Sequence, residues 1–318
     1  MVPATKIEVL TDLSPFIKLY TERLLGTPHV PPSPEDHCTG VSSKDTTISP
    51  NVSARLYLPK LSDPTQKLPI LVYYHGGGFC VESAFSSQYH RYMNILSATS
   101  GALVVSVEYR LAPEHLLPAA YDDSWYALKW VCYHVLDQPH FEKDEWITNH
   151  ADFNRVFIGG DSAGGNITHN MAMHAGSESL PGNVKILGAV LSYPHFWGSN
   201  PIGDEPTEDM EQHIAYRLSL FVYPSALGGI DNRSINPLAD GAPSLSGLGC
   251  SKIIVNLAEK DDFTSRGLAY AEEVKSSGWK GKVEVVVVEG EGHCFHIINP
   301  ETEKAKNLIK RLASFISQ

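Results

Sequence analysis

The sequence predicts an α/β protein in which a mainly parallel central sheet carries helices on both faces. Continuous apolar runs at residues 68–74 and 102–107 are typical of strands that are buried on both faces. Segments with helical spacing alternate with such runs along most of the chain, and this alternation favours a parallel sheet. With 318 residues, 42% of them hydrophobic, the chain is long enough to form one large domain around a core.

The strands and helices of this fold are assigned in chain order from their apolar patterns. Residues 53–58 alternate between polar and apolar side chains, which indicates a strand. Further strands are predicted at residues 68–74, 102–107, 155–158, 185–191, 252–257 and 283–288. Helices are predicted at residues 119–135, 164–174, 267–276 and 301–315. Ligands of such a sheet bind at the carboxyl ends of its strands.

Two segments outside this alternation are predicted to form a cap over a pocket. Residues 195–230 show no clear strand but contain many aromatic residues and prolines, so we interpret them as an insertion. Residues 1–45 form the other cap segment, within which residues 13–25 fit a short helix or a hairpin. Both segments belong to one domain, residues 1–318.

Charge and composition exclude several functional classes. The formal net charge of -11 argues against binding to nucleic acid or to an anionic membrane. No apolar run approaches the roughly 20 residues that a membrane helix requires, and residues 1–10 lack the apolar core of a secretory signal. Five cysteines without a closely spaced pair favour neither a disulfide framework nor a zinc site. We therefore expect a cytoplasmic monomer or homodimer that acts on a small molecule without a metal or another cofactor.

The strongest functional signal is the run Gly-Gly-Asp-Ser-Ala-Gly-Gly at residues 159–165. It places Gly-x-Ser-x-Gly between a predicted strand and a predicted helix, the context in which this motif presents a nucleophilic serine, here Ser162. Gly160 and Gly164 leave room for the tight turn, and amides at the start of the helix would stabilise an oxyanion. The alternative is a glycine-rich turn with an incidental serine, or a phosphate-binding loop.

A second glycine run, His-Gly-Gly-Gly-Phe at residues 75–79, follows a predicted buried strand. Glycines leave their backbone N–H groups unshielded, so that two of them can point at one oxygen atom. With the N–H of Ala163 they would form a three-donor oxyanion hole of the kind that lipases and esterases use. A flexible turn is the alternative, but it does not explain the position of the glycines at the end of a buried strand.

Candidates for a general base and its acidic partner follow the last two predicted strands. Asp261 and Asp262 come after the first of these strands, and His293 lies in a glycine-flanked loop after the second. His293 would take the proton of Ser162, and an aspartate would fix the tautomer of the imidazole. The alternatives are a solvent-exposed or core histidine and turn-forming aspartates. The pattern does not choose between the two aspartates.

Taken together, these motifs resemble the hormone-sensitive-lipase-like α/β hydrolases, and in particular the plant carboxylesterases. The resemblance implies the α/β-hydrolase fold. It covers nearly the whole chain and is carried by residues 75–79, 108–114, 118–123, 160–166 and 293–296. The branch named for 2-hydroxyisoflavanone dehydratase is similar at residues 82–85, 196–199 and 228–232.

Carried over position by position, the resemblance makes Ser162 the nucleophile and Asp261 the acid. His293, rather than His296, becomes the base. The oxyanion hole implied by the resemblance comprises Gly77, Gly78 and Ala163, with Gly76 supporting its turn. The residues expected to contact the substrate are aromatic: Phe79, Tyr193, Phe196, Trp197 and Tyr216.

The implied activity is that of a serine carboxylesterase, which hydrolyses esters of small-to-medium apolar or aromatic plant metabolites through an acyl-enzyme. One alternative is a dehydratase or cyclase of plant specialised metabolism, in which the same donors polarise a ketone and His293 removes a proton. Another is a hormone receptor. Receptors that resemble these esterases lack the catalytic histidine, whereas His293 is present in this sequence.

Overall fold

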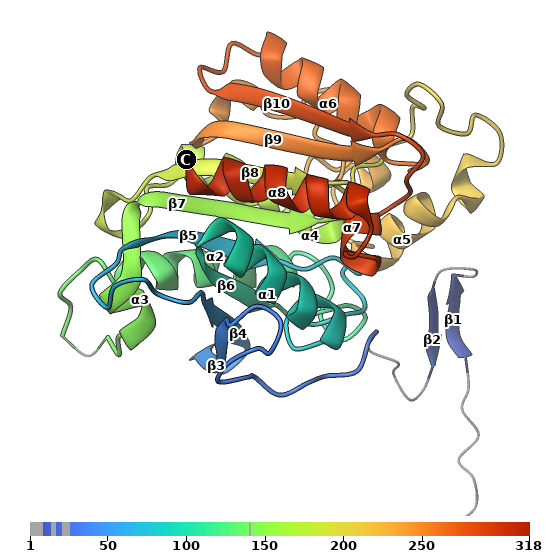
Figure 1. Ribbon diagram of the computed structural model, residues 1–318. Helices are drawn as coiled ribbons and strands as arrows, with labels where there is room; N and C mark the ends of the chain where they lie inside the picture. Colours follow the sequence, from blue (N-terminus) through green and yellow to red (C-terminus); the bar gives the residue numbers. More distant parts are fainter. Residues whose placement is uncertain (1–8, 14–16, 21–25, 140) are drawn as a thin grey trace, which may run out of the picture.

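The computed structural model describes residues 9–13, 17–20, 26–139 and 141–318, and within them eight strands form one central sheet (Figure 1). The strand order is β10-β9-β8-β7-β5-β6-β4-β3. The strands are β3 (Ser42–Ser49), β4 (Val52–Leu58), β5 (Leu68–Tyr74), β6 (Leu103–Glu108), β7 (Ala151–Asp161), β8 (Ile186–Ser192), β9 (Cys250–Ala258) and β10 (Lys282–Val288). From β6 to β10 neighbouring strands are parallel, whereas β4 is antiparallel to both β3 and β6.

The predicted strands are confirmed, with ends that shift by one to a few residues. The prediction for β5 coincides with the observed strand, and all seven of its residues are buried. Strand β3 was not predicted, because its sequence Ser-Ser-Lys-Asp-Thr-Thr-Ile-Ser is largely polar. A strand at the edge of a sheet needs little apolar surface, so its sequence carries a weak signal.

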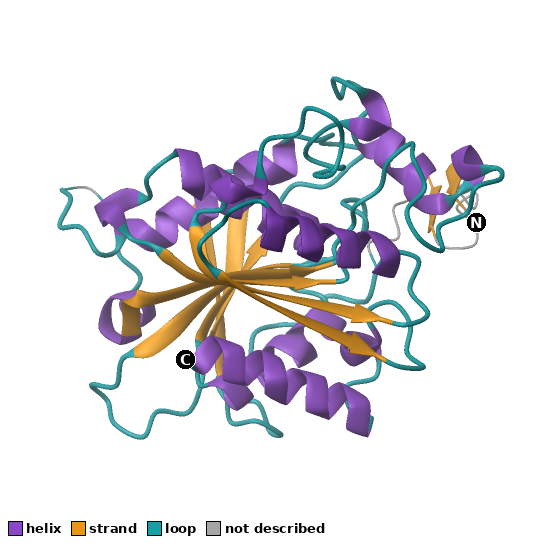
Figure 2. Cartoon of the chain, turned by 90° about the horizontal axis from the view of Figure 1, so that it is seen from above, coloured by secondary structure: helices purple, strands orange, loops and turns teal. Residues whose placement is uncertain are grey.

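Helices cover both faces of the sheet (Figure 2). The longer ones are α1 (Ser87–Ser100), α2 (Ala119–Tyr133), α4 (Ala163–Ser177), α6 (Thr264–Ser276) and α8 (Glu303–Ser317). The shorter ones are α3 (Glu145–His150), α5 (Ile214–Val222) and α7 (Phe295–Ile298). Helices α1, α7 and α8 pack together on one face, and α2 packs against α4 on the other. Helix α1 was missed because it buries polar Asn94 and Ser97, which obscures its apolar stripe.

The predicted cap segments are partly described. Residues 195–230 contain no strand in the described chain but do contain helix α5. Strands β1 (Val9–Leu13) and β2 (Ile17–Tyr20) form an antiparallel hairpin, one of the two forms predicted for residues 13–25; residues 14–16 and 21–25 lie outside the described residues. The predicted boundary at residue 45 is wrong, because β3 of the central sheet begins at Ser42.

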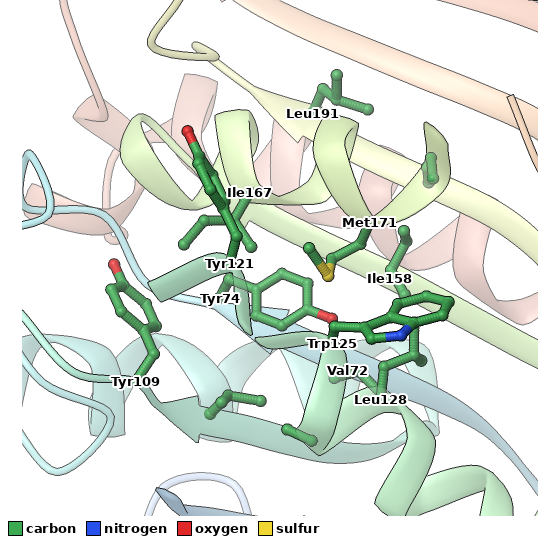
Figure 3. Close-up of a cluster of buried hydrophobic side chains, with 14 of the residues drawn as sticks. Val72, Tyr74, Tyr109, Tyr121, Trp125, Leu128, Ile158, Ile167, Met171 and Leu191 are labelled. Atoms are coloured by element: carbon green, nitrogen blue, oxygen red, sulfur yellow. The ribbon is translucent and has the colours of Figure 1, made fainter. Parts of the chain in front are cut away.

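The core between the sheet and its helices brings α4 close to the strands (Figure 3). Tyr74 of β5 and Ile158 of β7 pack with Trp125 of α2 and Met171 of α4. Each large apolar side chain that is fully buried stabilises the fold by about 1.5–3 kcal/mol. Since β7 runs directly into α4, this packing fixes the turn between them, which carries Ser162.

Candidate active site

Ser162 lies in the sharp turn where β7 ends and α4 begins. Its φ of 52° and ψ of -115° are unusual for a residue with a side chain, and such strain is characteristic of functional turns. The turn is held by the Ser162 N–H, which donates to the Ser192 carbonyl at 2.8 Å. A side chain at Gly160 or Gly164 would collide with backbone atoms, in both cases including the carbonyl oxygen of Tyr74. Small residues are therefore required on both sides, as the motif predicts.

His293 and Asp261 form a close pair at the carboxyl ends of β10 and β9. The distance from His293 Nδ1 to Asp261 Oδ2 is 2.7 Å. Asp261 is buried, whereas 36% of the His293 side-chain surface remains exposed. Burial lowers the pKa of His293, but the hydrogen bond and charge of Asp261, with the charges of Asp161 and Asp262, outweigh it and raise the pKa above its ordinary value.

The other candidate residues next to this pair have different partners. Asp262 Oδ2 lies 3.2 Å from Nε2 of His213, which caps helix α5. His296 is fully buried, and its ring contacts the hydroxyls of Tyr193 and Tyr92, each at 3.1 Å. The structure therefore pairs His293 with the aspartate at 261.

The glycine loop after β5 presents two of its residues to the same space. Gly77 and Gly78 line a cavity together with Ser162, and their φ values of 101° and 60° lie in the region that favours glycine. The Gly76 N–H instead donates to the Tyr89 hydroxyl at 2.8 Å. The N–H of Gly76 is therefore not free to bind an oxyanion. Gly76 instead anchors the loop, as expected of a residue that supports the turn. Ala163 is the first residue of α4, where backbone N–H groups have no partner within the helix.

A buried carboxylate, that of Asp161, connects the three loops of the site. It accepts hydrogen bonds from the hydroxyls of Tyr73 and Tyr89, both at 2.7 Å, and from the Cys294 thiol at 3.5 Å. Burial raises the pKa of Asp161, while these donors and nearby His293 oppose that effect. Because Asp161 precedes Ser162, Cys294 follows His293 and Tyr89 binds Gly76, one carboxylate joins the nucleophile turn, the histidine loop and the glycine loop.

All of these loops open into one cavity of about 420 Å³. Ser162, Asp261 and His293 lie in its wall. Ile214, Ala215 and Leu218 of α5 also contribute, so this part of the predicted cap covers the site. The remaining lining residues are Gly77, Gly78, Val81, Glu82, Gln88, Tyr89, Asp161, His195, His213, Asp262, Phe263, Cys294 and Ile298.

Comparison with known proteins agrees with this arrangement. Residues 71–297 match the model of a family described by its alpha/beta hydrolase fold. The chain belongs to the α/β-hydrolase family. This match begins within β5 and extends past His293, so it includes the loops that carry Ser162, Asp261 and His293.

Individual relatives of this α/β hydrolase are enzymes. The chain is 55% identical to 2-hydroxyisoflavanone dehydratase of Glycyrrhiza echinata, over 98% of this chain and 97% of that protein. It is 42% identical to "Probable carboxylesterase 13" of Arabidopsis thaliana, over 97% of this chain and 98% of that protein. A solved structure of a hyperthermophilic esterase from Pyrobaculum calidifontis has a TM-score of 0.67 at 30% identity, covering 86% of this chain and 85% of the other. The resemblance to plant carboxylesterases and to the dehydratase branch is confirmed.

The aromatic residues expected to contact the substrate are not among the described residues that line the cavity of this hydrolase. Phe79, Tyr193, Phe196 and Trp197 are at most 1% exposed, and Tyr216 packs against the core. As far as the structure describes the wall, none of these residues lies in it. Direct contact with substrate therefore has no support in this geometry. The position of an aromatic residue in the sequence does not show which way its side chain points.

Several residues of the cavity wall could not be predicted from the sequence pattern. Tyr89 belongs to the unpredicted helix α1, and Phe263 follows the acidic pair on the chain. His195 and His213 lie within the predicted insertion, and the sequence pattern there gives no reason to single them out. Fourteen histidines occur in the chain, so residue type alone could not select these two.

The described residues contain no group of three or more His, Cys, Asp or Glu side chains arranged to hold a metal ion. No helix in the described part of the hydrolase has both the length and the apolar character needed to span a bilayer.

Proposed function

We propose that this α/β hydrolase is a serine carboxylesterase, acting on esters of small-to-medium apolar or aromatic metabolites through an acyl-enzyme. The observation that carries the proposal is the His293–Asp261 pair, which opens into one cavity with Ser162, Gly77 and Gly78. These are the parts that acyl transfer requires: a nucleophile, an oriented base and donors for an oxyanion. The apolar wall around them suits an apolar substrate.

The proposed reaction has two halves. His293 Nε2 takes the proton of Ser162 Oγ as that oxygen attacks the ester carbonyl, and Asp261 stabilises the imidazolium through Nδ1. The N–H groups of Gly77, Gly78 and Ala163 stabilise the oxyanion. The carbonyl then re-forms, the C–O bond to the alcohol breaks, and His293 protonates the departing alcohol. Water, deprotonated by His293, attacks the acyl-enzyme, releasing the acid and restoring Ser162.

The test is removal of the nucleophile. Ser162→Ala should lower kcat on short p-nitrophenyl esters by at least about 10³-fold and abolish labelling by a fluorophosphonate. Ser244→Ala, at an exposed serine that does not line the cavity, is the matched control and should retain both. Turnover by Ser162→Ala at the rate of the control would overturn the proposal.

Elimination of water is the second candidate, favoured by the 55% identity to a dehydratase. The same backbone N–H groups would polarise a ketone. His293 would remove a proton from the neighbouring carbon and return it to the departing hydroxyl, so that a C–H and a C–O bond break, a C=C bond forms and water leaves. Ser162 would then form no covalent bond. Hydroxylated isoflavanones are the test substrates, with loss of water followed by mass spectrometry. Elimination that survives Ser162→Ala would favour this candidate.

A further inference from the structure

His195 is a buried histidine in the wall of the active-site cavity, outside the proposed catalytic residues. It follows β8, and its backbone N–H donates to the carbonyl of Ser162 at 2.9 Å. Its side chain therefore projects from a segment that is fixed to the nucleophile turn. Its ring packs against Phe263, with centroids 4.9 Å apart, and edge-on against Phe79 at 6.1 Å. Only 2% of the residue is exposed.

The hydrogen bonds of His195 favour one tautomer. Nε2 lies 3.0 Å from the hydroxyl oxygen of Ser219. When that hydroxyl donates its proton to the Ala215 carbonyl, 2.7 Å away, it accepts a hydrogen bond from His195. In this arrangement Nε2 carries the proton and Nδ1 carries a lone pair. The reverse tautomer would satisfy fewer donors, because Nδ1 has no acceptor among the described residues.

The Nδ1 lone pair is an unused acceptor beside the reacting centre. Nδ1 has no hydrogen-bond partner among the described residues. It is also not one of the fully buried polar atoms that lack a partner, so part of its surface remains accessible. His195 belongs to the cavity wall, and the acceptor at Nδ1 therefore lies near a molecule bound in the cavity. Burial, with the charges of His293 and His213, lowers the pKa of His195 to about 3. The ring is thus neutral at physiological pH and acts as neither a cation nor a general base.

We propose that His195 is a specificity-determining residue, whose Nδ1 accepts a hydrogen bond from a hydroxyl group on an aromatic ring of the substrate, next to the reacting carbonyl. The proposal rests on the proposed function for the identity of the carbonyl site, but the contact itself requires no hydrolysis. A hydroxyl matches a neutral acceptor in an apolar wall, and Phe263 provides a surface for the ring that carries it. A methoxy group of similar size has no proton to donate and leaves Nδ1 unpaired.

The test compares ligands that differ in this one proton. The three hydroxyacetophenone isomers and their methoxy counterparts are aryl ketones without an ester bond, and their Kd values are measured by calorimetry. At least one hydroxy isomer should bind the wild-type protein about 3- to 10-fold more tightly than its methoxy counterpart, the factor expected for one neutral hydrogen bond. His195→Phe should abolish that ratio, whatever happens to the absolute affinity.

Two further variants separate a direct contact from a structural effect. Ser219→Ala removes the acceptor of the Nε2 proton, which frees the ring to place its proton on Nδ1. The preference should then shrink or reverse in favour of the methoxy ligand. His169→Phe is the matched control, since His169 is equally buried, has its pKa lowered to about 3 and makes a single ring hydrogen bond, to Tyr270. This control should keep the wild-type ratio.

Hydrolysis of p-nitrophenyl hydroxybenzoates and methoxybenzoates is measured in parallel. A hydroxyl preference in binding without any hydrolysis would overturn the proposed esterase while supporting the contact at His195. Hydrolysis without a preference for any hydroxy isomer, or a preference that His195→Phe retains, would overturn the role of His195 and leave the esterase proposal standing.

Discussion

The hydroxyl of Tyr89 donates a hydrogen bond to the buried carboxylate of Asp161, 2.7 Å away. The same hydroxyl accepts the N–H of Gly76 at 2.8 Å, so helix α1 ties the glycine loop to the turn that carries Ser162. An oxyanion hole stabilises a transition state only when its donors are held in place before the reaction. Tyr89 and Asp161 supply that restraint without touching the substrate carbonyl themselves.

Removing this restraint should lower the rate more than the affinity. Tyr89→Phe deletes the hydroxyl while keeping the ring, so Gly77 and Gly78 should lose alignment. We expect kcat on p-nitrophenyl acetate to fall about 10- to 100-fold, with a smaller change in KM. Tyr126→Phe, at an exposed tyrosine of α2, is the control and should leave both constants unchanged. A Tyr89→Phe enzyme with wild-type kcat would show that the Tyr89 hydroxyl is not needed to align the glycine loop.

The pH dependence of activity should report the carboxylates around His293. The base must be neutral to accept a proton, and nearby Asp161 and Asp262 raise its pKa. Asp262→Asn removes one negative charge, so the pKa of His293 should fall and the acidic limb of kcat/KM against pH should move to lower pH. Glu272→Asn, at a surface carboxylate of α6, should leave the limb in place. A shift of the acidic limb to higher pH would contradict the predicted fall in the pKa of His293.

The two neighbouring aspartates should differ sharply in their contribution to the rate. Asp261→Asn replaces the partner of His293 Nδ1 and allows the wrong tautomer, so kcat should fall by about 10³- to 10⁴-fold. Asp262→Asn should change kcat at the pH optimum by less than about 10-fold, because its partner is His213. Steady-state kinetics at each variant's optimum decide between them. Equal losses would refute the assignment of Asp261.

The glycines of the nucleophile turn should be intolerant of any side chain. A Cβ at Gly164 would overlap the carbonyl of Tyr74, the last residue of β5, and that of His75 directly after it; the Tyr74 carbonyl cannot move without disturbing the sheet. Gly164→Ala should therefore destabilise the fold by about 3 kcal/mol or more, or prevent folding. Gly292→Ala is the control, because a Cβ there meets nothing within 4 Å. The measurement is the midpoint of chemical unfolding; similar midpoints would show that the turn can relax.

Much of the framework could be predicted because its signals are local. Strand β5 is a continuous apolar run and coincides with its prediction. By contrast, α1 buries polar residues and β3 is largely polar, so neither shows the apolar pattern of its element. Only the neighbouring segments explain why these two elements form. The choice between Asp261 and Asp262 is of the same kind: adjacent side chains point in different directions, one to His293 and one to His213.

By itself, the sequence determined the parallel sheet, the turn around Ser162 and the loops that follow each strand, because apolar runs and glycine spacing act over a few residues. Tertiary structure alone decided that Asp161 and Tyr89 join those loops and that His195, in place of its aromatic neighbours, opens into the cavity. These outcomes depend on side-chain direction and on which buried polar atoms find partners. Both are properties of packing between segments that lie far apart along the chain.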